Sequence, residues 1–157
     1  HKAKELQYHT KMINSGRYVN DSMGRYIGKK VVKKIISQGK NILGAHVLVM
    51  GMTFKENVSD IRNSKVADII NEFKDFGAEV DVMDPFASPL EVLQEYGIRL
   101  VERPGKKYDA VVVAVAHTTY LKLDESYFMS ITNEHAVLAD VKGVYRGSIH
   151  QMIYWSL

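Results

Sequence analysis

The residues between Gly51 and Ser64 are the strongest candidates for binding chemistry in this chain. Their sequence, GMTFKENVSDIRNS, follows an apolar run at 46–50 that is typical of a buried strand, and it precedes a helical pattern at 65–76. A loop between a strand and a helix N-terminus can bind an anion, because backbone N–H groups and the positive end of the helix dipole meet there. Lys55 and Arg62 add two cations, so the loop predicts a phosphate-rich ligand. An ordinary turn with two solvated bases explains the same pattern about equally well.

Several kinds of site are excluded by composition. Gly51 stands where a dinucleotide fingerprint has three glycines, so the loop is neither GxGxxG nor a P-loop. With 0 Cys the chain has no disulfide, thiolate zinc site or cysteine nucleophile, which fits a cytoplasmic location. The 6 His show no metal-binding spacing, so we expect no metal. No apolar run approaches the ~20 residues that span a bilayer, and we expect no membrane association.

The charge is divided unevenly along the chain. Residues 1–42 carry ten Lys and Arg against two acids, whereas residues 43–157 carry eleven against sixteen, so the net +3 combines +8 and −5. This pattern predicts either a basic arm for nucleic acid or a surface helix with a basic, solvated face. We favour the second and expect no nucleic acid partner, because few aromatic residues, Tyr18 and Tyr26 among them, interleave with the bases.

A long helix is predicted for residues 11–38. An apolar residue recurs at every fourth position along it, at Met23, Ile27, Val31 and Ile35. At about 1.5 Å per residue the helix would be roughly 42 Å long. So small a domain offers no obvious cover for this stripe, so we expect a homodimer through the 11–38 helix. Its continuity is left open, because Gly16 and Gly24 could introduce a kink.

The remainder alternates between strands and helices. We predict strands near 45–50, 79–83, 98–101, 109–115 and 136–140, and helices near 64–77, 88–96, 124–131 and 147–151. Such alternation is typical of βαβ units. The predicted fold class is α/β, a Rossmann-like, doubly wound and mainly parallel sheet preceded by a long α-helix. We divide the chain into a helical segment at 1–42 and a Rossmann-like domain at 43–157.

Polar residues follow four of the predicted strands, and in such sheets ligands lie outside the carboxyl ends of the strands. Lys55 and Arg62 follow the first strand, Asp84 the second, and Lys142 the last. Asp84 could be a ribose-binding acid, but without the glycine fingerprint a turn or capping role is favoured. His117, which follows the 109–115 strand, is placed beside this edge and is assigned no chemistry.

These segments resemble a known family in their order and spacing. The loop 51–64 is similar to the start of the C-terminal, UDP-binding domain of the UDP-glucose/GDP-mannose dehydrogenase family. Residues 15–26 (SGRYVNDSMGRY) resemble its central dimerisation helix, and residues 1–9 resemble the segment after its catalytic cysteine. DVMDP at 81–85, VAVAH at 113–117 and DVKGVY at 140–145 resemble its later strand ends. The wording is most similar to members that act on UDP-N-acetylhexosamines.

The resemblance implies a function for the parent protein. It would be an NAD-dependent UDP-sugar 6-dehydrogenase that oxidises the C6 alcohol to a carboxylate for polysaccharide biosynthesis. Phe54, Lys55 and Lys142 would bind the UDP-sugar, although an arginine stands at the position of Lys142 in the UDP-glucose branch. Arg62 would contact NAD, which a missing N-terminal domain would mainly hold.

The reaction of the resembling family requires a cysteine and an NAD fingerprint, and this chain has neither, so the resemblance implies a C-terminal piece of a longer enzyme. We therefore expect no catalytic residue in this chain and no activity of the chain alone. Alternatives from other classes are a stand-alone nucleotide-binding regulatory module and, less favoured, a nucleic-acid binder that uses the basic helix.

Overall fold

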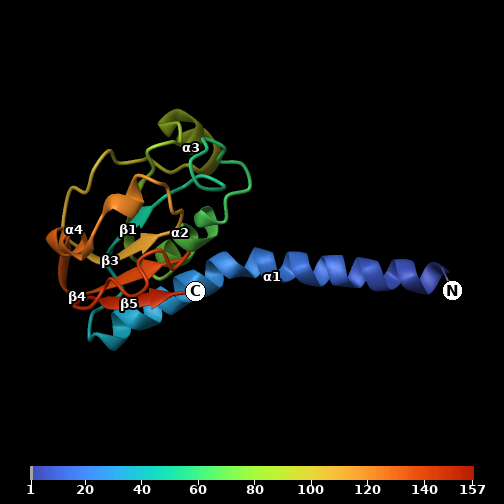
Figure 1. The fold of residues 1–157 in the computed structure, drawn as a ribbon, viewed down its shortest axis with the longest axis horizontal. Helices are drawn as coiled ribbons and strands as arrows, with labels where there is room; N and C mark the ends of the chain where they lie inside the picture. The colour runs from blue at the N-terminus through green and yellow to red at the C-terminus, as the bar shows by residue number, and fades with distance from the viewer. Residues whose placement is uncertain (1) are drawn as a thin grey trace.

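A parallel five-stranded sheet with helices on both faces forms the body of the domain (Figure 1). The computed structural model describes the backbone of residues 2–157 and the side chains of residues 16 and 18–157. The strands are β1 (His46–Met50), β2 (Glu79–Met83), β3 (Tyr108–Val113), β4 (Thr132–Asp140) and β5 (Ile153–Ser156). Their order is β2-β1-β3-β4-β5, and every pairing is parallel. The predicted α/β, Rossmann-like fold class is confirmed.

The helices are α1 (Lys2–Ser37), α2 (Val66–Asp75), α3 (Pro89–Tyr96) and α4 (Glu125–Ser130), with a short 3₁₀ turn, η1, at Tyr120–Lys122. Alternate residues of the central strands serve the two faces of the sheet. Val47 and Val49 pack with α1 and α2, whereas Leu48 and Met50 pack with η1 and α4. Strands buried on both faces require near-continuous apolar runs, which is what β1 and β3 have.

The long helix is continuous, and its apolar stripe is covered by its own domain. Ile27, Val31 and Ile35 are buried in the same core as Val47 and Ile70. The expectation that this stripe lacks cover within the domain is therefore wrong at these three residues, because α2 and the sheet cover them. The homodimer through the 11–38 helix stays a prediction. The opposite, basic face is exposed at Arg25, Lys29 and Lys33, as predicted.

Close approach of α1 to α2 is made possible by two glycines. A Cβ at Gly24 would lie 2.7 Å from Asp68 Cβ and 2.8 Å from the Lys65 carbonyl oxygen, and a Cβ at Gly28 would lie 2.7 Å from Glu72 Cβ. The helix is one unbroken α-helical element of 36 residues. The N-terminal half of α1 projects from the body of the domain (Figure 1).

Three other elements differ from the sequence prediction. The 98–101 segment is not a strand, because it contributes only an isolated bridge from Leu100 to Val82 at the edge of the sheet. Residues 147–151 form turns rather than a helix. Residues 153–156, which we did not predict as a strand, form β5 at the other edge beside β4.

Candidate functional site

The loop after β1 starts with a glycine that no residue with a Cβ could replace without strain. Gly51 has φ 98°, and a Cβ there would lie 2.5 Å from Val115 Cβ. The glycine thus allows β1 and the end of β3 to approach each other, which is a packing role. The loop then passes Phe54 and Lys55 and reaches the start of α2 at Val66.

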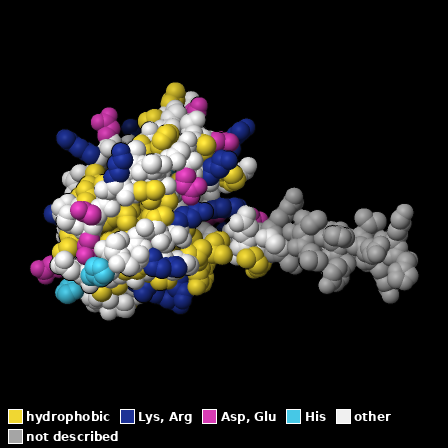
Figure 2. Space-filling model, viewed as in Figure 1, with side chains coloured by type: hydrophobic (Ala, Val, Ile, Leu, Met, Phe, Trp, Pro, Cys, Tyr) yellow, Lys and Arg dark blue, Asp and Glu magenta, His cyan; other side chains and the backbone are white. Residues whose placement is uncertain are grey.

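A cavity of about 770 Å³ lies where this loop, α1 and the carboxyl ends of three strands meet. Its walls include Thr53 and Phe54 after β1, Ala114 and Val115 after β3, Val141 and Lys142 after β4, Ser64–Val66 at the start of α2, and Asn20, Asp21, Met23, Gly24 and Ile27 of α1. Ligands of open α/β sheets bind at this edge. Figure 2 shows hydrophobic side chains exposed where the body of the domain meets the projecting helix.

Two of the predicted substrate residues line this cavity. The Phe54 side chain is 59% exposed at the cavity wall. Lys142 follows β4, and its Nζ lies 3.8 Å from Glu56 Oε1 on the β1 loop. Buried Asp140 shapes the turn that carries Lys142, because its carboxylate accepts hydrogen bonds from the N–H groups of Gly143 (2.9 Å) and Tyr145 (2.7 Å). The third predicted substrate residue, Lys55, is exposed on the same loop and does not line the cavity.

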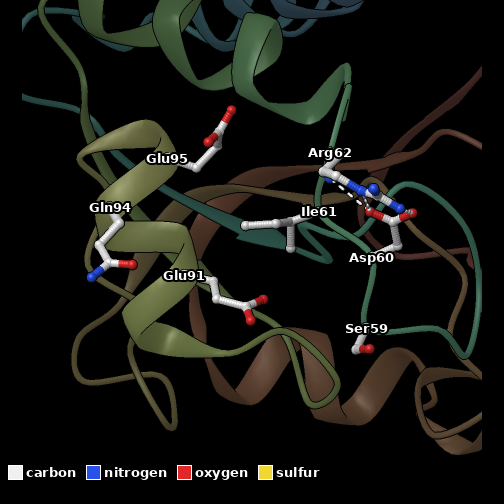
Figure 3. A pocket seen from close by; sticks show the side chains of 7 residues that line it. All are labelled: Ser59, Asp60, Ile61, Arg62, Glu91, Gln94 and Glu95. Carbon is white, nitrogen blue, oxygen red and sulfur yellow. Dashed lines mark hydrogen bonds and ion pairs between the residues drawn. The ribbon is translucent and has the colours of Figure 1, made fainter.

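Arg62 lies at a different cavity. Together with Ser59–Ile61 and with Glu91, Gln94 and Glu95 of α3, it lines a space of about 460 Å³ (Figure 3). Its guanidinium binds Asp60 with both arms, at 3.0 Å from Nε to Oδ1 and 3.0 Å from Nη2 to Oδ2. The hydrogen bonds from Arg62 lower the pKa of Asp60 to about 2. Arg62, the predicted cofactor contact, therefore lies apart from Phe54 and Lys142, and its guanidinium is paired with the carboxylate of Asp60.

Asp84 is committed to the protein itself. Its Oδ1 accepts the N–H groups of Phe86 (2.7 Å) and Ala87 (3.0 Å), and its Oδ2 accepts those of Met52 (2.6 Å) and Thr53 (3.1 Å). Burial opposes ionisation, but the hydrogen bonds from His117 and the backbone outweigh it and bring the pKa of Asp84 down to about 2. The favoured turn role is confirmed, and no acceptor is left over for a ribose.

One wall of the larger cavity was missed by the sequence analysis. Lys65 Nζ lies 2.7 Å from Asp21 Oδ1, and this ion pair connects the start of α2 to α1 at the cavity wall. The hydrogen bond with Asp21 raises the pKa of Lys65, so the cation is secured. The available signal was that Lys65 begins a helix at a ligand-binding edge, while Asp21 lies in the segment that resembles the family's central helix.

The part of the chain that the structure describes contains neither a membrane-spanning helix nor a metal-binding cluster. None of its helices combines the length and apolar character that crossing a membrane requires. No group of three or more His, Asp or Glu side chains among those described residues is arranged to hold a metal ion.

Comparison with known proteins gives consistent results. Residues 48–147 match the family model of the UDP-glucose/GDP-mannose dehydrogenase family, UDP binding domain. The UDP-N-acetyl-D-glucosamine 6-dehydrogenase of Pseudomonas aeruginosa is 39% identical over 143 residues, which are 90% of this chain and 34% of that protein. The enzyme of the same name from Salmonella typhi is 37% identical over 145 residues, 92% of this chain and 34% of that protein. The chain thus spans about a third of the length of these relatives.

Solved structures agree. The UDP-N-acetyl-mannosamine dehydrogenase Cap5O from Staphylococcus aureus superimposes with a TM-score of 0.73 at 27% identity, over 94% of this chain and 34% of that one. A UDP-glucose dehydrogenase from Pyrobaculum islandicum gives a TM-score of 0.64 at 27% identity, over 88% of this chain and 31% of that one. The family match at 48–147 includes most of β1, all of β2 to β4, the β1 loop and the Lys142 turn. On this basis the chain belongs to the UDP-glucose/GDP-mannose dehydrogenase family and corresponds to its UDP-binding domain.

Proposed function

We propose that this chain is the C-terminal, UDP-sugar-binding part of an NAD-dependent UDP-N-acetylhexosamine 6-dehydrogenase. The parent enzyme would oxidise the C6 alcohol of the sugar to a carboxylate for polysaccharide biosynthesis. The observation that carries the proposal is the cavity of about 770 Å³ at the carboxyl edge of the sheet, in a chain that belongs to a UDP-binding family. The two relatives at 37–39% identity, both named UDP-N-acetyl-D-glucosamine 6-dehydrogenase, support the choice of sugar class.

The walls of the cavity suit a nucleoside diphosphate. The exposed ring of Phe54 offers an apolar face to the uracil or the sugar. Lys142 and the first turn of α2 supply positive charge for the diphosphate. Lys55, which is exposed beside Phe54, would reach the phosphate from the rim as a mobile point charge. Lys142 would exchange its long, 3.8 Å pairing with Glu56 for a phosphate oxygen.

This chain alone does not fit NAD. Asp84 stands where a ribose-binding acid would be, but its carboxylate is saturated by the protein. Gly51, the one glycine of the loop, faces Val115 rather than open space. We therefore assign the main cofactor contacts to another part of the parent enzyme. Arg62 would join them only by exchanging Asp60 for a phosphate, and we propose this single contact for it.

The role left to this chain is to bind and orient the substrate. The oxidation of an alcohol to an acid through a covalent thiol intermediate needs a cysteine, and this chain has 0 Cys. The purified chain should therefore produce no NADH from a UDP-sugar. Reduction of NAD by the chain alone, under conditions where a full-length relative is active, would refute this division of roles.

Calorimetric titration of the chain with UDP tests the substrate assignment. A hydrogen bond to a charged group contributes about 1.5–3 kcal/mol, so Lys55→Ala and Lys142→Ala should each weaken UDP binding by roughly 10- to 150-fold. Arg62→Ala should leave the affinity unchanged, because Arg62 lines the other cavity. Lys74→Ala is the matched control, since Lys74 is exposed in the last turn of α2. Loss of UDP binding in Arg62→Ala together with wild-type binding in Lys55→Ala would mean that the two roles are reversed.

A further inference from the structure

The loop from Gly51 to Asn57 is fixed at both of its ends by buried polar groups. At the first end, the N–H groups of Met52 and Thr53 donate to Asp84 Oδ2, at 2.6 and 3.1 Å. At the second end, the N–H of Asn57 donates to Nδ1 of His117 at 3.0 Å. Phe54, Lys55 and Glu56 lie between the two anchors, so the anchors decide where these side chains are presented.

His117 connects the two anchors. Its ring is fully buried, with Nε2 2.9 Å from Asp84 Oδ2. Because a backbone N–H can only donate, Nδ1 must carry a lone pair, and the ring proton is therefore on Nε2 and directed at Asp84. Thr53 Oγ1, 3.3 Å from Nε2, donates its own proton to the Lys55 carbonyl and so presents a lone pair to the same N–H. Both nitrogens of this histidine are thus used to hold the loop.

The orientation of the ring and of Asn57 is fixed independently. The rings of Phe86 and Tyr120 lie against His117, with centroids at 4.8 and 5.5 Å. Asn57 has a left-handed backbone, with φ 58°. Its side chain exchanges two hydrogen bonds with Thr118, from Nδ2 to Thr118 Oγ1 (2.8 Å) and from the Thr118 N–H to Oδ1 (2.9 Å). The segment after β3 therefore holds the far end of the β1 loop.

We propose that His117 is a positioning residue that, through Asp84 and Asn57, holds the β1 loop in the conformation that presents Phe54 and Lys55 to the ligand. This inference rests on the proposed binding of UDP at the neighbouring cavity. If ordering of the loop is part of binding, the apparent affinity falls in proportion to the fraction of molecules whose loop is ordered. Removal of His117 leaves the Asn57 N–H without its acceptor and weakens that end of the loop, which then depends on the two hydrogen bonds with Thr118.

Three variants of the 157-residue chain test the inference. His117→Ala removes both ring contacts. His117→Asn places an amide oxygen near the position of Nδ1, so it should keep the bond to Asn57 and lose the one to Asp84. Thr118→Val leaves the core intact and removes the acceptor of the Asn57 side chain, so the inference stays testable if His117→Ala does not fold. His150→Ala, at an exposed histidine outside the cavity, is the matched control.

The first measurement is made without ligand, so it does not depend on the proposed function. Hydrogen exchange at the Asn57 amide should be at least about tenfold faster in His117→Ala than in the wild type, with partial rescue in His117→Asn. The second measurement is calorimetric titration with UDP. The dissociation constant of UDP should rise roughly tenfold in His117→Ala and severalfold in Thr118→Val. The value for His117→Asn should lie between those of the wild type and His117→Ala.

The outcomes separate the two proposals. If the wild-type chain does not bind UDP, the proposed function fails, while the exchange measurement still decides whether His117 holds the loop. If folded His117→Ala shows a lower melting temperature but wild-type exchange at Asn57 and wild-type UDP affinity, the residue is only a part of the core and the inference is wrong. Wild-type affinity in Thr118→Val together with no rescue by His117→Asn would also overturn it.

Discussion

The close approach of α1 to α2 at Gly24 gives a quantitative prediction for Gly24→Ala. The added Cβ would lie 2.7 Å from Asp68 Cβ, about 0.7 Å less than the 3.4 Å at which ordinary contacts begin. The second neighbour, the Lys65 carbonyl at 2.8 Å, is backbone and cannot rotate away as a flexible side chain would. Accommodating the methyl group therefore requires the helices to separate, which loosens the packing of Ile27 and Val31 against the core.

Two effects of opposite sign decide the size of this change. Alanine is better than glycine inside a helix by about 1 kcal/mol. Overpacking of a well-filled contact costs about 1–3 kcal/mol. We expect a net destabilisation of up to about 2 kcal/mol for Gly24→Ala. Each kcal/mol corresponds to a fall in Tm of roughly 2–4 °C for a domain of this size.

Chemical and thermal unfolding measure this effect, and Gly16→Ala is the matched control. Gly16 lies in the same helix, but a Cβ there meets nothing within 4 Å. It should leave the free energy of unfolding unchanged or raise it by up to about 1 kcal/mol. The difference between the two variants isolates the packing cost, because both gain the same helix propensity. Equal stability of Gly24→Ala and Gly16→Ala would refute the close contact of α1 with α2.

Two further predictions concern Asp84 and the start of α3. Because the folded pKa of Asp84 is about 2, below its ordinary 3.8, its ionised form contributes stability above pH ~4, and this contribution of about 2 kcal/mol is lost as the pH falls toward 2. Urea unfolding of the wild type and of Asp84→Asn between pH 2 and 6 should show this component in the wild type alone. Ser88 caps α3 by accepting the Glu91 N–H, so Ser88→Ala should lower the free energy of unfolding by about 1 kcal/mol. Ser126→Ala is the control in the same assay, and it should cost less because Asp124, not Ser126, caps α4.

The central strands were predictable because their burial on both faces leaves a strong local signal. The apolar runs at β1 and β3 are buried on both faces of the sheet and do not show the alternating pattern of a half-exposed strand. The 98–101 segment carries a similar run, but Ile98 and Leu100 pack against the core from the edge without forming a ladder. Strand pairing at an edge depends on which neighbour is present, which a local pattern does not contain. The same reason explains why β5 was missed.

The site was predictable as an edge of the sheet but not as a set of contacts. The rule that ligands bind at the carboxyl ends of parallel strands placed the β1 loop and Lys142 at one edge, and Phe54 of that loop lines a cavity together with Lys142. It could not separate Lys55 from Arg62, because the direction of each side chain depends on the path of the loop. That path is set by Asp84 and His117, which lie 33 and 60 residues beyond Gly51 and Asn57.

The unbroken course of α1 has a mechanical consequence for the cavity that it borders. Residues 20–27 form a wall of the cavity, while the part of the helix before them extends for roughly 30 Å at about 1.5 Å per residue. A rotation of only about 5° at the wall would move the far end of such a rod by roughly 3 Å. Gly24 and Gly28 allow this part of α1 to pack directly on α2, so the cavity wall would be the pivot of such a rotation. Ligand-induced adjustments too small to change the fold would thus be amplified with distance, and the distal end of α1 is the place to look for them.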